Sequence, residues 1–202
     1  MPFDRNVFIN TPFDTRYQPL FNAIVFTIQL AGFEPRCALE ASNAGQFRLE
    51  RIMSIISECR YGLHDLSRTQ LSREGLPRFN MPLELGLDLG CRRFGTARQR
   101  DKRLLVMDVK RYRYQKFISD IAGQDIEAHG NRVNIVIQRV RDWLRTGSGD
   151  ERIPGAAHLR DRYQRFRQSM PRVCRTSHLT PSELTFADRC KVALLWLQEA
   201  ER

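Results

Sequence analysis

The sequence NMPLELGLDLG, residues 80–90, decides how the rest of the chain is interpreted. Its leucines alternate with polar residues and glycines, as they do in a half-buried strand, yet Asn80 followed by Pro82 is typical of the capped start of a helix. The preceding loop is rich in turn-forming and charged residues, which favours the helix. On a helix, Glu84 and Asp88 lie one turn apart on the same side, where their charges repel each other. This acidic pair is therefore either a solvated stripe or part of a site with a ligand beside it.

Short apolar strands are predicted on both sides of this helix. They cover residues 6–10, 33–39 and 59–66 before it and residues 102–109 after it. Helical periodicity over residues 17–30 and 47–58 separates the earlier strands. This alternation predicts an α/β fold, a flavodoxin-like, doubly wound, mostly parallel sheet of four to five strands with helices on both faces. Residues 125–129 are either a short fifth strand or a loop.

The second half of the chain is predicted to be helical and basic. Apolar residues recur at helical spacing over residues 133–144 and again over 159–166, where arginines are dense. The stretch TGSGD at 146–150 is typical of a linker. The sequence TPSE at 180–183 matches a capping box with proline at the first helical position, which predicts a last helix to about Glu199.

Length and composition limit how many domains the chain can form. A chain of 202 residues with 42% hydrophobic and 28% charged residues is long enough for one globular domain and an appended segment. We expect an α/β domain over residues 1–146 and a basic helical C-terminal extension over residues 147–202. The net charge of +10 is concentrated in the second half of the chain. This extension could pack on the sheet, join protomers, or bind nucleic acid.

Several classes of protein lack support in the sequence. No apolar run approaches the ~18 residues of a membrane span and the start has no signal-peptide layout, so we expect a cytoplasmic protein without a membrane partner. The five cysteines are scattered without a CxxC pair, which predicts reduced thiols and no metal site. The phosphate-binding motif GxxxxGK[ST] and the motifs GxGxxG, GxSxG and HExxH are absent, which argues against a kinase, an ATPase or an ordinary dehydrogenase. We expect no cofactor.

Polar residues follow the ends of two predicted strands and open the next helix. Asn10 and Asp14 follow the first strand, His64 and Asp65 end the third, and Glu84 lies early on the helix after it. Because the carboxyl ends of parallel strands meet at one edge, we expect a pocket there. Carboxylates accept hydrogen bonds from sugar hydroxyls and stabilise the cationic transition state of N-glycosidic bond cleavage, so Glu84 is the candidate catalytic group. A structural role for the histidine stays an alternative.

Three stretches together resemble a known family. VFINTPFD at 7–14, GLHDLSR at 62–68 and NMPLELGLDLG at 80–90 are similar to the nucleoside 2-deoxyribosyltransferase-like proteins and to their distant relatives, the bacterial TIR-like domains. The resemblance covers about residues 6–110. One departure is the approach to the helix, residues 75–80, which is basic and contains proline, whereas the transferases usually have a Gly-rich, acidic approach.

The resemblance implies roles for particular residues. Glu84, in its Glu-x-Gly context, corresponds to the nucleophile, and Asp65 to a strand-ending aspartate that assists catalysis. The expected substrate is a nucleoside, a nucleotide or NAD, and a homo-oligomer is expected because related sites are often completed by a neighbouring subunit. The TIR-like relatives further imply a regulated hydrolase, for example in antiviral defence. The residues expected to bind substrate are Asn10, Pro12, Phe13, Asp14, Tyr17, His64, Arg68, Arg78, Asn80 and Asp88.

Two other functions are compatible with the sequence. The protein could be a non-catalytic nucleotide sensor in which Glu84 only binds ribose. It could also be a nucleic-acid-associated protein that binds through its basic C-terminal helices.

Overall fold

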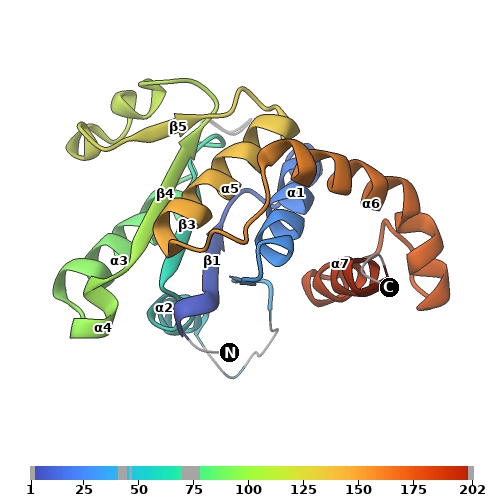
Figure 1. Ribbon diagram of the computed structural model, residues 1–202. Coiled ribbons are helices and arrows are strands. Elements are labelled where there is room, and N and C mark those ends of the chain that lie inside the picture. Colours follow the sequence, from blue (N-terminus) through green and yellow to red (C-terminus); the bar gives the residue numbers. More distant parts are fainter. Residues whose placement is uncertain (1–2, 41–44, 46, 70–77, 200–202) are drawn as a thin grey trace.

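A computed structural model describes residues 3–40, 45, 47–69 and 78–199 of the chain. Its centre is an all-parallel sheet of five strands in the order β2-β1-β3-β4-β5 (Figure 1). The strands are β1 (Asn6–Asn10), β2 (Glu34–Cys37), β3 (Tyr61–Asp65), β4 (Arg103–Asp108) and β5 (Ile126–Ala128). The strand order reverses between β1 and β3, which is the point where open α/β sheets bind ligands. The prediction of a flavodoxin-like, doubly wound fold is confirmed, and residues 126–128 form the fifth strand.

Helices cover both faces of this sheet because side chains alternate along each strand. Val7 and Ile9 face α1 (Gln18–Leu30) and α5 (Val133–Ser148), with which they share one core cluster. Phe8, between them, points to the other face and packs against α2 (Arg48–Ser57). On that same face α3 (Asn80–Phe94) packs against α2 and is followed by the short α4 (Ala97–Arg100).

The C-terminal helices α6 (Ala156–Thr176) and α7 (Phe186–Glu199) pack on α1, on the side away from α2 and α3 (Figure 1). Phe26 of α1 is the centre of this contact, because its ring stacks on Phe166 at 4.9 Å and lies 5.4 Å from Tyr163 and 5.8 Å from Trp196. Three short 3-10 helices complete the described elements: η1 (Phe3–Arg5), η2 (Arg113–Lys116) and η3 (Ser119–Ile121).

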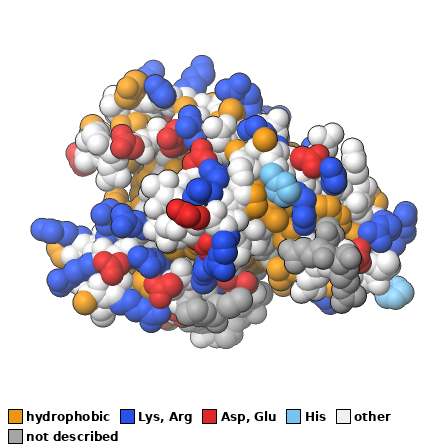
Figure 2. Space-filling model, viewed as in Figure 1, with side chains coloured by type: hydrophobic (Ala, Val, Ile, Leu, Met, Phe, Trp, Pro, Cys, Tyr) orange, Lys and Arg blue, Asp and Glu red, His pale blue; other side chains and the backbone are white. Residues whose placement is uncertain are grey.

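The basic side chains are spread over the molecule. On the face shown in Figure 2, Lys and Arg lie over α3 and α4, over the loops around β5 and over α6. Several arginines of α6 also have partners within the chain, since Arg162 lies over the Trp196 ring, Arg165 pairs with Asp161 and Arg172 pairs with Glu199. Among the helices of the described part, none is long and apolar enough to cross a membrane.

Three predicted boundaries are wrong. Asn80 is not the cap of α3, because Phe79 is the residue that precedes the helix and no side chain forms a capping hydrogen bond at its start. The predicted linker is helical up to Ser148, where Gly149 ends α5 in the left-handed conformation that glycine adopts without strain. The last helix begins at Phe186 and not at Thr180, because Thr185 and Asp188 bond each other reciprocally through side chains and backbone N–H groups.

Candidate active site at the carboxyl edge of the sheet

Helix α3 turns its acidic side chains inward. Glu84 and Asp88 are buried together with Met81 and Leu85, whereas the side chain of Leu83 is 53% exposed. The solvated stripe is therefore excluded as an explanation of the acidic pair. The two carboxylates nevertheless have different surroundings, and these surroundings separate their roles.

Asp88 is part of a buried ion pair. Its Oδ2 lies 3.0 Å from His64 Nε2 and its Oδ1 lies 3.1 Å from Lys102 Nζ, and all three side chains are inaccessible to solvent. Lys102 Nζ also donates to the carbonyl oxygens of Ile56, at 2.7 Å, and Cys59. Asp88 was predicted to bind substrate, but the contacts that the structure gives it are to the protein itself.

His64 connects this ion pair to the end of β1. Asn10 and His64 are paired in register at the carboxyl ends of β1 and β3. Asn10 Nδ2 lies 3.0 Å from His64 Nδ1 and donates to the carbonyl oxygen of Met81 at 2.8 Å. Because a carbonyl oxygen only accepts, the Asn10 amide must present its NH₂ group to both partners. His64 Nδ1 is then the acceptor, and the ring proton on Nε2 points to Asp88.

Asp65 belongs to a second buried cluster. Its Oδ2 accepts a hydrogen bond from Tyr17 Oη and lies 3.1 Å from His129 Nε2, while its Oδ1 accepts one of 2.8 Å from the backbone N–H of Ser67. Burial acts to raise the pKa of Asp65, but His129, Tyr17 and Ser67 outweigh it and hold the pKa below its ordinary value. Burial, followed by the Asp65 carboxylate, raises the pKa of Tyr17 well above its ordinary value.

Glu84 differs from Asp65 and Asp88 in its surroundings. Its side chain is on the second turn of α3, the residue is only 9% exposed, and among the described residues it has no hydrogen bond or ion pair. Burial raises the pKa of Glu84 to about 7, against the opposing charge of Arg48 at the start of α2. Near neutral pH the group is thus divided between its neutral and ionised forms, and a nearby positive charge favours ionisation.

The rim around these clusters contains more exposed residues. Asp14 Oδ2 lies 3.5 Å from Arg68 Nε, and its Oδ1 accepts hydrogen bonds from the backbone N–H groups of Arg16 and Tyr17. Arg78 and Asn80 are exposed next to the start of α3.

The loop after β1 is directed toward the C-terminal helices. Pro12 is buried, and Phe13, which is 40% exposed, packs edge-on against Phe21 of α1. Apart from Glu84 and the loop residues Pro12 and Phe13, the predicted residues form three groups: the buried chain of Asn10, His64 and Asp88, the Tyr17–Asp65 cluster, and the more exposed rim.

Sequence reasoning missed two residues of these clusters. Lys102 precedes β4, and the sequence pattern predicts it only as the first residue of that strand. His129 follows β5, and its place as one more polar residue at a strand end was the available signal. The backbone N–H of Asn131 donates to His129 Nδ1 at 3.0 Å, which places the proton of its ring on Nε2, toward Asp65. Within residues 3–40, 45, 47–69 and 78–199, no group of three His, Cys, Asp or Glu side chains is arranged to hold a metal ion.

No protein-family model, curated protein or solved structure matches this chain. The function of the site is therefore argued from its geometry and chemistry.

Proposed function

We propose that this protein cleaves or exchanges an N-glycosidic bond of a nucleoside, a nucleotide or NAD, with Glu84 as the reacting carboxylate. The observation that carries the proposal is the burial of Glu84 without a partner among the described residues, beside the point where the strand order reverses. A carboxylate that is largely removed from water and has no partner destabilises a fold. A ligand that brings positive charge to this place compensates for that cost.

The chemistry of N-glycosides supplies such a charge. As the bond between the anomeric carbon and the base nitrogen breaks, its electron pair leaves with the base and positive charge develops on the sugar ring. Ionised Glu84 either stabilises this charge or forms a bond to the anomeric carbon. Water then attacks the same carbon and loses a proton, which gives hydrolysis, or a second base attacks it, which gives exchange.

The buried clusters position Glu84 and the sugar. Asn10 holds the first turn of α3 through the Met81 carbonyl, and His64, Asp88 and Lys102 hold Asn10. We assign Asp65 a positioning role toward Tyr17 and His129. At the rim, Asp14 and Arg68 are suited to a ribose hydroxyl and a phosphate, respectively.

The chemistry of the leaving group decides which substrates the proposal favours. Among the described acids at this edge other than Glu84, Asp14 pairs with Arg68, Asp108 pairs with Arg113, and both Asp65 and Asp88 are held by buried partners. A purine or pyrimidine departs readily only when an acid protonates it, whereas the nicotinamide of NAD departs as a neutral molecule without protonation. We therefore place NAD and related pyridinium N-glycosides first and other nucleosides second.

Chromatography of the products tests the proposal. Purified protein is incubated with NAD, nucleoside monophosphates and deoxynucleosides, and release of nicotinamide or free base is measured for the wild type, Glu84→Gln and Glu50→Gln. Glu50 is an exposed acid in the first turn of α2 and provides the matched control. We expect release by the wild type and by Glu50→Gln but not by Glu84→Gln. Equal release by all three would show that Glu84 takes no part in the reaction.

A nucleotide sensor is the second candidate, and the engagement of Asp65 with Tyr17, Ser67 and His129 favours it. With that carboxylate occupied, the site has few groups free for proton transfer. Calorimetric titration with NAD separates the candidates, since a sensor binds NAD without any release of nicotinamide.

A homo-oligomer is part of the proposal. α2 and α3 pack against each other and leave apolar side chains exposed, namely Leu49 and Met53 on α2, Leu83 on α3, and Phe47 and Phe79 just before them. Light scattering of Leu83→Arg, compared with Leu194→Arg on α7, tests whether this surface joins protomers. If the wild type is a monomer, the oligomer is excluded under those conditions.

A further inference from the structure

A pocket lies between the loop after β1 and the start of α7. It has a volume of about 250 Å³, and Phe13, Phe21 and Phe186 form its aromatic wall while Gln18 and Arg189 provide polar groups. Helix α7 and the residues just before it therefore build a cavity together with the α/β domain. Apart from the loop that carries Phe13, the pocket shares no residue with the clusters around Glu84.

The aromatic wall is arranged before any ligand binds. The rings of Phe13 and Phe21 are perpendicular with centroids 5.6 Å apart, and the ring of Phe186 lies 6.1 Å from that of Phe21. Phe21 and Phe186 are buried, whereas Phe13 is 40% exposed. A planar ligand could thus pack against rings whose positions are already determined by the core.

Arg189 carries a charge that lacks a carboxylate partner in the described part of the chain. Its Nη1 donates to Asn22 Oδ1 at 3.0 Å, and Gln18 Nε2 donates to the same oxygen at 3.1 Å. Asn22 therefore holds both side chains in place without neutralising the guanidinium. The neighbouring Asp188 carboxylate is bonded to Thr185 at the start of α7. Burial lowers the pKa of Arg189, as expected for a partly buried cation without an ion pair.

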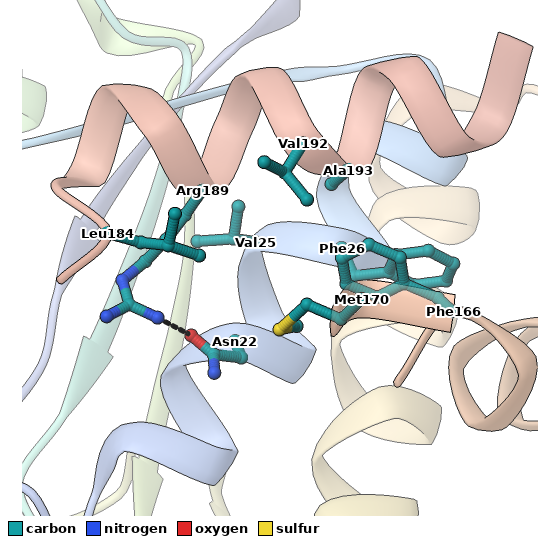
Figure 3. Close-up of a pocket in the computed structure, with 9 residues that line it drawn as sticks. All are labelled: Asn22, Val25, Phe26, Phe166, Met170, Leu184, Arg189, Val192 and Ala193. Atoms are coloured by element: carbon teal, nitrogen blue, oxygen red, sulfur yellow. Dashed lines mark hydrogen bonds between the residues drawn. The ribbon is translucent and has the colours of Figure 1, made fainter. Parts of the chain in front are cut away.

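The space between Arg189 and the neighbouring side chains of α1 and α6 has no room for a ligand. Figure 3 shows Arg189 reaching from α7 to Asn22 on α1, with Val25 beside Arg189 and Met170 and Phe166 farther to the right. The free space among these side chains is about 10 Å³, which is about the volume needed for a single water molecule. The 250 Å³ pocket, which Arg189 also lines, has room for an anion.

We propose that this pocket binds an anionic aromatic small molecule, with its carboxylate or phosphate on Arg189 and its ring against Phe13 and Phe186. The volume is slightly below the ~300 Å³ at which pockets for drug-sized ligands begin, so one or two fused rings fit. A guanidinium with free N–H donors binds such an anion through charge-assisted hydrogen bonds. Gln18 supplies a further hydrogen-bonding group beside it.

Binding of 2-naphthoate and of its neutral analogue 2-naphthamide tests this site without reference to any enzymatic activity. Affinities are measured by ligand-observed NMR titration for the wild type, Arg189→Gln and Arg167→Gln. Arg167 is exposed on α6 and without an ion pair among the described residues, so its variant controls for the loss of one positive charge. We expect naphthoate to bind the wild type and Arg167→Gln equally, and Arg189→Gln at least about tenfold more weakly. Naphthamide should bind all three alike.

Three results would overturn the proposal: no binding of naphthoate to the wild type, equal binding of the acid and the amide, or unchanged naphthoate binding to Arg189→Gln. Circular dichroism establishes that the variants are folded. The salt dependence of the wild type is a second measurement that needs no variant, because raising the salt concentration should weaken naphthoate binding and leave naphthamide binding unchanged. Failure of these tests would leave the role of Glu84 untouched.

Discussion

Asn10 Nδ2 donates a hydrogen bond of 2.8 Å to the carbonyl oxygen of Met81, and this bond ties the carboxyl end of β1 to the first turn of α3. The same nitrogen lies 3.0 Å from His64 Nδ1. One amide group therefore connects two neighbouring strands and the helix that carries Glu84. The position of the candidate catalytic carboxylate depends on this connection.

Replacing the donor in Asn10→Asp should loosen the site. The carboxylate oxygens would face the Met81 carbonyl and the lone pair of His64 Nδ1, so we expect a loss of about 1–3 kcal/mol in the free energy of unfolding. Urea denaturation measures this loss. Asn134→Asp, at an exposed position of α5, is the control and should change stability by less than about 0.5 kcal/mol. Equal effects of the two substitutions would contradict the role given to Asn10.

Removing the buried cation in Lys102→Met should be more damaging. Asp88 would keep its charge in the interior with only His64 beside it, and such broken pairs cost about 3–5 kcal/mol. Lys110→Met removes an exposed lysine and should be nearly neutral. Adding Asp88→Asn to Lys102→Met should recover part of the loss, because it removes the uncompensated charge. A double variant as unstable as the single one would show that the charge is not the cause.

Gly62 tests the contact between β3 and α3. A Cβ atom at this position would lie 2.1 Å from Asp88 Oδ2 and 2.7 Å from Leu104 Cδ2, so Gly62→Ala should destabilise the protein by about 2–3 kcal/mol. Gly86, on the exposed side of α3, has nothing within 4 Å of its would-be Cβ. Gly86→Ala should therefore be neutral or stabilising by up to about 1 kcal/mol, since alanine favours helix. In thermal melts, the melting temperature should fall for Gly62→Ala and stay the same or rise for Gly86→Ala.

The raised pKa of Glu84 predicts how stability depends on pH. The ordinary value is 4.5 and the value in the fold is about 7. Between these values the unfolded chain has lost the proton and the folded chain retains it, so this group lowers stability as the pH rises through that window. Glu84→Gln removes the effect, and the variant should gain up to about 3 kcal/mol relative to the wild type at pH 8 but not at pH 4. Urea denaturation at the two pH values gives the difference, which Glu50→Gln should not show.

The same ionisation predicts the pH dependence of the proposed reaction. A carboxylate that attacks or stabilises the sugar must be ionised, so kcat/KM for the most active substrate should rise with pH and level off above about 7. Initial rates between pH 5 and 8.5 measure this dependence. A rate that falls over the same range would assign Glu84 to proton donation instead.

The sequence by itself determined the fold class. Alternating strands and helices, strand lengths of a few residues and the periodicity of α1, α2 and α5 are local properties, because they arise from which neighbouring residues can be buried together. They also placed Asn10, His64, Asp65 and Glu84 near one edge, since parallel strands end there. Helix boundaries were harder to predict from the sequence. At Thr185, for example, the competing caps differ by only a few hydrogen bonds.

Only the tertiary structure decided which acidic residues are paired with basic groups. Glu84 and Asp88 are equivalent in spacing on one helix, yet Asp88 meets Lys102 and His64 while Glu84 has no partner among the described residues. That difference depends on contacts between residues far apart in the chain, and these contacts leave no periodic signal in the sequence. The same holds for Arg189, which lines a pocket built from both ends of the chain and has no carboxylate partner among the described residues. Burial and charge pairing are properties of the assembled core, and they distinguish the paired Asp88 from Glu84.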